Sequence, residues 1–190
     1  MTAALITGPA LEPIALADAK AHLRIDHDAD DTLLQAAIAS ARYHVETVTK
    51  RALIAQGWRI YLDAWPRSRI VRLAVAPVLS VDAVTVYDAA GDPVVLDAAD
   101  YEADTASVPA RLVLAAGAPA PARAVNGIEI DVTAGYGPSS VDVPGALRQA
   151  VLMLVAHWYE HRGAVGHDLA VLTAPLGFEA LVAPHRILSL

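Results

Sequence analysis

The stretch from Asp31 to Trp65, DTLLQAAIASARYHVETVTKRALIAQGWRIYLDAW, contains the change of periodicity that decides the fold class. In its first part apolar residues recur every three or four positions, which predicts an amphipathic helix that runs to about Lys50. From Gln56 the period falls to two, which is typical of a strand. The alternating apolar residues are Trp58, Ile60 and Leu62.

The pattern continues in both directions from this stretch. Short apolar runs bounded by glycine or proline predict further strands at 70–75, 81–87, 94–96, 111–114 and 127–133. Helices are predicted on either side of this block, over 16–25 and from Val143-Pro144 to about His161, where proline suits a first turn. Aspartates at 28, 30 and 31 are expected to cap and open the second helix.

The sequence therefore predicts an α+β fold. The N-terminal helices and a long C-terminal helix are expected to pack as a bundle, with a β-rich block inserted between them. The predicted divisions are an N-terminal helical part of the core (1–55), the inserted β block (56–135), the C-terminal core helix (136–165) and a C-terminal tail for partner binding (166–190).

Composition narrows the class of function. The chain has 190 residues, 55% of them hydrophobic, which is enough for a buried core. Its net charge of −7 argues against binding to nucleic-acid phosphates, and the lack of cysteine excludes disulfides and thiolate chemistry. The N-terminus does not have the pattern of a signal peptide, and the longest apolar run, 150–156, is too short to cross a bilayer. We therefore expect a soluble protein without a membrane partner.

The stretch AHWYEHR at 156–162 contains H-x-x-E-H, the spacing of inverted zinc peptidases. In that interpretation His157 and His161 bind the metal and Glu160 is the general base. The third, acidic ligand is missing unless it comes from the 29 residues that follow, where the acids are Asp168 and Glu179. About 100° of rotation per residue also places His161 within the apolar stripe of its helix, which favours a packing role.

Two other motifs resemble ligand sites but have better explanations. Asp26-x-Asp28-x-Asp30 begins like a calcium loop, yet it lacks the glycine at position six and the glutamate at position twelve, so capping is favoured. Gly135-x-Gly137 lacks the third glycine of a dinucleotide fingerprint and is interpreted as a turn. We predict no catalytic residue, no metal and no cofactor.

The last predicted helix is apolar nearly all round, because 151–156 reads VLMLVA. Such a helix must be covered on every side, either within the chain or by another copy. The candidates for helix packing or a ring interface are Met153, Val155, Trp158 and Tyr159. The apolar C-terminal tail is a second surface expected to need a partner.

Several motifs, taken in their order along the chain, carry a family resemblance. They are EPIALADAKAHLRI (12–25), DD (30–31), TKRAL (49–53), WR (58–59), LDAWP (62–66), TAGYG (133–137), VP (143–144), LRQA (147–150), HWYEHR (157–162), PLG (175–177), AL (180–181) and PHR (184–186). In this set the chain resembles the head-tail connector family, also called adaptor or head completion proteins, of long-tailed phages and gene transfer agents. Loop 115–126 lacks a tryptophan expected in the family, and its role stays open.

The resemblance implies a non-enzymatic protein that forms a ring, typically of twelve copies, under the portal of a phage, prophage or gene transfer agent particle. The ring joins head to tail and leaves a channel through which DNA passes without specific binding, which suits an acidic chain. The implied partners are the portal protein and a tail-side connector or stopper protein. The implied location is the bacterial cytoplasm during assembly and then the head-tail junction of the virion or virion-like particle. The residues implied in portal binding are Phe178, Leu181, Val182, Pro184, His185, Arg186, Ile187 and Leu188. The alternatives are the zinc hydrolase and a generic α+β binding module.

Overall fold

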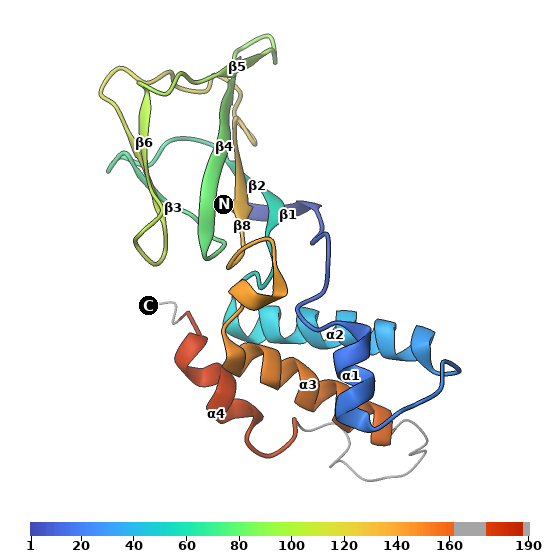
Figure 1. Cartoon of the computed structure of the whole chain (residues 1–190). Helices are drawn as coiled ribbons and strands as arrows, with labels where there is room; N and C mark the ends of the chain where they lie inside the picture. The colour runs from blue at the N-terminus through green and yellow to red at the C-terminus, as the bar shows by residue number, and fades with distance from the viewer. Residues whose placement is uncertain (162–173, 188–190) are drawn as a thin grey trace, which may run out of the picture. The chain divides into compact units, whose positions relative to one another are not determined.

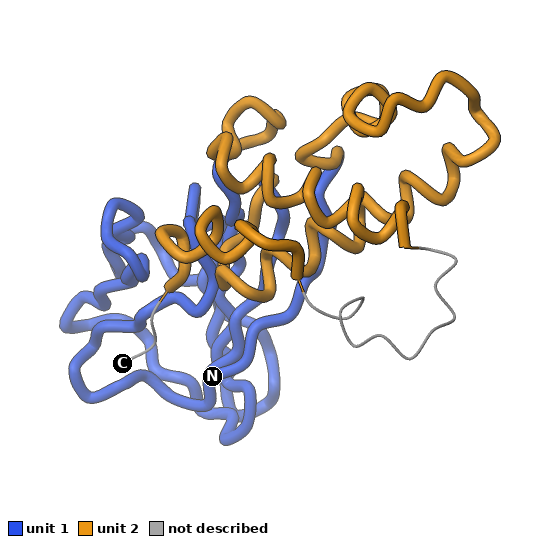
Figure 2. The backbone as a smooth tube through the Cα atoms, turned by 90° about the horizontal axis from the view of Figure 1, so that it is seen from below, with its two compact units in different colours: residues 1–10, 55–136 blue, residues 11–54, 137–190 orange. Residues whose placement is uncertain are grey.

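The computed structural model describes residues 1–161 and 174–187 and divides the chain into two compact units (Figures 1 and 2). The β unit comprises Met1–Ala10 and Ala55–Tyr136, and the helical unit comprises Leu11–Ile54 and Gly137–Leu190. Each unit is thus built from two separate stretches of the chain. The α+β class predicted from the sequence is confirmed.

The β unit contains two antiparallel sheets. The larger has the order β1-β2-β8-β4-β5, with bounds Thr2–Thr7, Gln56–Leu62, Ile128–Ala134, Val78–Tyr87 and Pro93–Val95. The smaller has the order β3-β7-β6, with bounds Ile70–Arg72, Arg111–Leu114 and Tyr101–Asp104.

Strand β8 lies at the centre of the larger sheet, and its alternation decides which face is buried. Ile130 pairs with Ile60 on one side and with Val84 on the other, and all three side chains are fully buried. The intervening Glu129 and Asp131 point to the opposite, partly solvated face. The predicted period of two is therefore confirmed, and it sets the register because a slip by one residue would exchange the two faces.

Strands β1 and β6 were not predicted. β1 reads TAALIT, in which apolar residues are adjacent and do not alternate, and its six residues are mostly exposed at the sheet edge. β6 reads YEAD and is also an edge strand with no fully buried residue. Pairing with β2 and β7 specifies these strands, because an edge strand has backbone hydrogen bonds on one side without needing a buried face.

The helical unit consists of α1 (Leu16–Leu23), α2 (Asp31–Thr49), α3 (Gly145–Glu160) and α4 (Phe178–Val182), with short 3-10 turns η1 (Ser140–Asp142) and η3 (Ala183–His185). α2 packs on α3, α1 contacts both, and α4 contacts α3 and α2. The predicted stripe of α2 is buried at Leu34, Ile38, Ala41 and Val45. The buried residues of α3 include Leu147, Val151 and Leu154.

Helices α1 and α2 end in the same way, without glycine. Arg24 and Lys50 adopt left-handed backbone conformations at φ 57° and φ 56°. The amide after each then donates to a carbonyl five residues earlier, Ile25 to Lys20 and Arg51 to Glu46. This is the Schellman arrangement, which satisfies free carbonyls at the helix end at a cost of about 1 kcal/mol for a side chain in that conformation.

The predicted aspartate cap of α2 is wrong in its mechanism. Asp30 occupies the N-cap position, but its side chain makes no capping hydrogen bond. Asp28 and Asp31 instead accept from the ammonium group of Lys20 on α1, at 2.6 and 2.8 Å. These aspartates therefore tie α1 to the start of α2, because a nearby lysine competes with the backbone amides for their oxygens.

Candidate functional site

The C-terminal segment 175–187 is the first candidate site, and two of its side chains anchor it to the helical unit. Phe178 is 1% exposed and Val182 0%. The Phe178 ring lies 5.6 Å from the ring of His44 on α2, and His44 also meets Trp158 of α3 edge-on at 6.3 Å. Phe178 and Val182 are therefore occupied by packing within the chain.

Polar contacts hold the end of the segment against the C-terminal end of α2. The Ile187 amide donates to the Thr49 carbonyl at 3.1 Å, and the Arg51 guanidinium donates to the His185 carbonyl. Burial, and to a smaller extent the charge of Arg51, lowers the pKa of His185 below its usual 6.5. The segment is thus docked as far as the last described residue.

The remaining side chains of the segment are at least partly accessible. Pro184 is exposed, and Leu181, His185, Arg186 and Ile187 are half-buried. Arg186 pairs with Glu179 at 2.8 Å, so its charge is balanced locally. Leu188 lies outside the described residues. A partner would meet this outer side of the segment while Phe178 and Val182 hold its inner side.

The candidate interface residues on α3 pack within the helical unit. Val155 is 1% exposed, and Trp158 lies against His44. The Tyr159 hydroxyl donates to the Asp30 carboxylate at the start of α2. Met153 lies beside Gly177, the residue before α4. Helices of the same chain therefore cover much of the apolar surface of α3 that the sequence left without a partner.

The H-x-x-E-H motif does not form a metal site in the part of the chain that is described. The rings of His157 and His161 lie 4.5 Å apart, and His161 Nδ1 is 2.7 Å from the His157 carbonyl, to which it must donate. His157 Nε2 is buried with no hydrogen-bond partner among the described residues. No group of three histidines or acids suited to a metal occurs within 1–161 and 174–187. Of the two possible third ligands, Glu179 pairs with Arg186 and Asp168 lies outside those residues.

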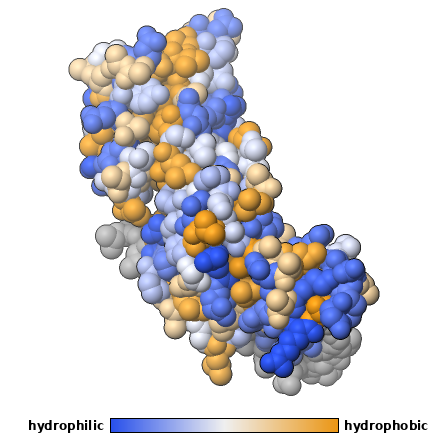
Figure 3. Space-filling view, in the orientation of Figure 1, coloured by the Kyte–Doolittle hydropathy of each residue, from blue (hydrophilic) through white to orange (hydrophobic). Residues whose placement is uncertain are grey.

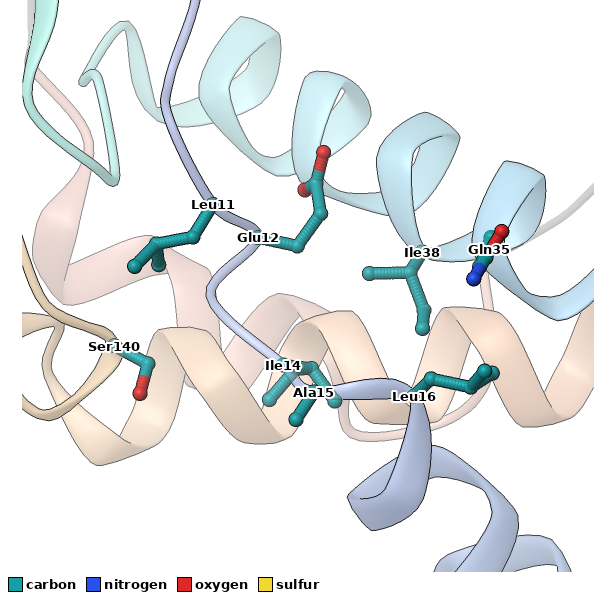
Figure 4. A pocket seen from close by; sticks show the side chains of 8 residues that line it. All are labelled: Leu11, Glu12, Ile14, Ala15, Leu16, Gln35, Ile38 and Ser140. Carbon is teal, nitrogen blue, oxygen red and sulfur yellow. The ribbon is translucent and has the colours of Figure 1, made fainter.

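A shallow groove runs along one side of α2 (Figure 4). Its volume is about 540 Å³, and its lining is mostly apolar: Leu11, Glu12, Ile14, Ala15, Leu16, Gln35, Ile38 and Ser140. The Glu12 carboxylate accepts from Arg42 Nε at 2.8 Å and is therefore neutralised. Five of the eight lining residues are apolar, so the groove is suited to binding an apolar side chain.

Sequence reasoning missed this groove. It arises where the segment 11–16 crosses α2, which brings Leu11 and Ile14 near Gln35 and Ile38, more than twenty positions away in the chain. Periodicity describes each helix alone and carries no signal for the space between two segments.

The solvated face of the larger sheet has a network of paired charges. Arg59 on β2 makes two hydrogen bonds to Asp131 on β8, at 2.7 and 2.9 Å, and lies 3.0 Å from Glu129. The hydrogen bonds that Arg59 donates to Asp131 raise the pKa of Arg59. The Arg123 guanidinium lies 5.2 Å above the Tyr87 ring. Glu129 and Asp131 of β8 therefore both pair with one arginine of β2.

None of the described helices combines the length and the apolar character needed to span a bilayer. The face drawn in Figure 3 mixes hydrophilic and hydrophobic residues over both units.

Comparison with known proteins identifies relatives over the whole chain. The family model for the phage gp6-like head-tail connector protein matches residues 13–79. A chain in the neck of an empty gene transfer agent (GTA) particle, computed with C6 symmetry, is 33% identical, with a TM-score of 0.79. A chain in the virion of a native gene transfer agent particle is 31% identical, with a TM-score of 0.81. A chain in the neck of a native GTA particle, computed with C12 symmetry, is 34% identical, with a TM-score of 0.68.

Each of these three similarities covers 100% of this chain and 97% of the relative. No curated protein sequence matches the chain.

Proposed function

The chain belongs to the phage gp6-like head-tail connector family and is a structural head-tail adaptor, and from this we propose that twelve copies form a ring beneath the portal of a particle. The observation that carries the proposal is the similarity to neck proteins over the full length of both chains, at 33% and 34% identity. The sixfold and twelvefold symmetry of those necks supports a closed ring of twelve. Such a ring would join head to tail and leave a channel for DNA.

Each unit has a role in this proposal. We propose that α1, α2 and α3 act as one bundle that builds the ring and faces the portal, while the β unit meets neighbouring copies or a tail-side connector. The net charge of −7 supports a channel through which DNA slides, because a basic lumen would bind phosphates. A structural protein of this kind needs no catalytic site, and we propose that the chain is not an enzyme.

The portal contact is assigned to the outer side of the C-terminal segment. The accessible residues there are Leu181, Pro184, His185, Arg186 and Ile187, and Leu188 follows them directly in the sequence. Phe178 and Val182, which the resemblance also implied in this contact, would instead fix the segment in place, because both are buried in the helical unit. The segment is docked at its inner side, and Leu181, Pro184 and Ile187 are accessible apolar residues on its outer side, which suits a partner that adds a second layer.

Electron microscopy of the purified chain mixed with the portal protein tests the ring. We expect added density with twelvefold symmetry on one end of the portal. A chain that remains monomeric alone is compatible with this, since the portal can template the ring. Failure to bind the portal, with no added density, would overturn the proposal.

A substitution tests the portal contact. Truncation after Gly177 is a poor choice, because it removes two buried side chains and would destabilise the unit. Ile187→Asp keeps the anchors and places a charge on the outer side, so we expect particles in which heads separate from tails. The matched control is Val141→Asp, an exposed valine of the helical unit outside the segment 175–187. Firmly joined particles with Ile187→Asp would show that the portal contact lies elsewhere.

The two alternatives from the sequence are less well supported. The zinc hydrolase is not supported by the comparisons, and its histidines have no third ligand among the described residues. A generic binding module would use the groove on α2, but the groove lies in a chain whose relatives are parts of particle necks.

A further inference from the structure

The outward side of α2 has an unusual composition for a solvated helix. Its exposed residues Leu33, Ala36, Ser40, Tyr43 and Thr47 are called the outer face of α2 below. At about 100° per residue they fall within roughly 80° of one another, opposite the buried stripe that includes Leu34 and Val45. None of the five is charged, and Leu33 and Tyr43 are 44% and 69% exposed.

The charges of α2 lie away from this face and already have partners. Arg42 pairs with Glu12 and Glu46, both at 2.8 Å, and Asp31 pairs with Lys20. On the face itself, the Thr47 hydroxyl donates to the Tyr43 carbonyl at 2.8 Å. An exposed helix face is ordinarily charged, and an uncharged strip with an exposed leucine and an exposed tyrosine is typical of a protein interface.

The groove described above lies on a different side of the same helix. Gln35 and Ile38 line it from α2, and about 100° per residue places them well away from the outer face. In Figure 4 the Ile38 side chain points into the space between α2 and the segment that contains Ile14. The helical unit therefore presents two apolar surfaces that face in different directions.

A closed ring requires two different surfaces on each copy, because every copy touches one neighbour on each side through a head-to-tail contact. We propose that the outer face of α2 in one copy seats in the groove of the next copy, with Tyr43 as the anchor. This inference rests on the proposed ring function. The outer face has no charged residue, and the Glu12 carboxylate on the groove lining is paired with Arg42. The Gln35 amide and the Ser140 hydroxyl on the same lining offer hydrogen bonds to a tyrosine hydroxyl.

A second copy fits these surfaces better than the portal or a tail protein. The occupant of the groove must be an apolar, uncharged side chain on a convex surface, and Tyr43 on the same chain meets this description. The other candidates are distinguished by the test below, in which contacts between copies are read directly.

Cysteine cross-linking tests the contact cleanly, because the chain contains no cysteine. Tyr43→Cys and Leu11→Cys together, in copies assembled on the portal, are expected to give a ladder of oxidised species from dimer to full ring. Tyr43→Cys alone should give no ladder, because the contact is between different surfaces. The control pair, Tyr43→Cys with Leu176→Cys at a fully exposed position outside the groove, should also remain monomeric on a denaturing gel.

Electron microscopy of the same samples distinguishes a wrong contact between copies from a failure to form the ring. Rings without a cross-link for the Tyr43–Leu11 pair would overturn the contact and leave the adaptor function intact. A chain that forms no ring with the portal, even without substitutions, would overturn both. A ladder from Tyr43→Cys alone would indicate a contact between two outer faces and would also overturn the proposal.

A charge substitution provides an independent readout. Tyr43→Asp is expected to reduce ring occupancy on the portal at least tenfold, while circular dichroism and the unfolding midpoint stay close to those of the parent, because the side chain is exposed in the single copy. Leu176→Asp, at a 99% exposed position of the helical unit outside both surfaces, should leave occupancy unchanged. Parental occupancy with Tyr43→Asp would refute the assignment.

Discussion

Removal of the Phe178 ring is the sharpest test of how the C-terminal segment is held. The side chain is 1% exposed and lies against His44, whose ring also meets Trp158. A buried phenylalanine replaced by alanine loses about 3–5 kcal/mol, from the lost burial and from the cavity left behind. α4 is only five residues long, so few other contacts can compensate.

We therefore expect Phe178→Ala to lower the free energy of unfolding of the helical unit by about 3 kcal/mol or more, and its thermal midpoint by roughly 10 °C. The assay is urea unfolding followed by far-ultraviolet circular dichroism, which reports on the helices. Limited proteolysis should also show earlier cleavage within 178–187, because a weakened anchor opens locally.

The matched control is Leu176→Ala, two residues earlier, where the side chain is 99% exposed. It should change stability by less than about 0.5 kcal/mol, as surface substitutions ordinarily do. A loss below about 1 kcal/mol for Phe178→Ala would refute the reasoning, because the segment would then contribute little by docking on α2 and α3.

Three further predictions concern pH and backbone packing. Hydrogen bonds from Ser107 and Arg111 lower the pKa of Asp104 from 3.8 to about 2. The stability that this carboxylate contributes is therefore present above pH 4 and is lost as the pH falls toward 2. In Asp104→Asn the thermal unfolding midpoint should depend less on pH over this range than it does in the parent. Burial lowers the pKa of His185, so the docked segment favours the neutral ring and is most stable above pH 6.5. As the pH falls below that value, the protection of residues 178–187 from hydrogen exchange should decrease. Gly127→Ala should destabilise the β unit by about 1–3 kcal/mol in urea unfolding, because the added methyl group would press on the Arg123 carbonyl. Gly91→Ser is the comparison, because the space beside Gly91 is open and only the strain of its positive φ of 90° would be measured.

Most of the helices and strands could be predicted from local patterns. The buried stripe of α2 and the alternation in β8 each state which side of an element is covered, and the structure confirms both. The edge strands β1 and β6 could not be predicted, because partners on one side and not a buried face specify them. The aspartates before α2 follow the same rule, since Lys20 on another helix decides which of them pair.

The C-terminal segment is a candidate site in the sequence and in the structure, and the structure shows which of its side chains are buried. The apolar character of residues 178–187 is visible in the sequence. The sequence does not distinguish an apolar residue that packs within its own chain from one that contacts a partner. Only the packing of α4 separates the buried Phe178 and Val182 from the accessible Pro184. The groove and the outer face of α2 needed the structure for the same reason, although the absence of charge at Leu33 and Tyr43 was already a readable signal.

The sequence by itself determined the α+β class, the two long helices, most strands and the acidic, cysteine-free composition, because periodicity and charge are properties of the chain that survive without coordinates. The order of motifs also pointed to the family. Only the tertiary structure decided which histidines, aspartates and apolar residues contact other parts of the same chain. Each of these contacts joins two segments that are separated by tens of residues in the sequence. His44 between Trp158 and Phe178 is the clearest case, since no local pattern relates position 44 to positions 158 and 178.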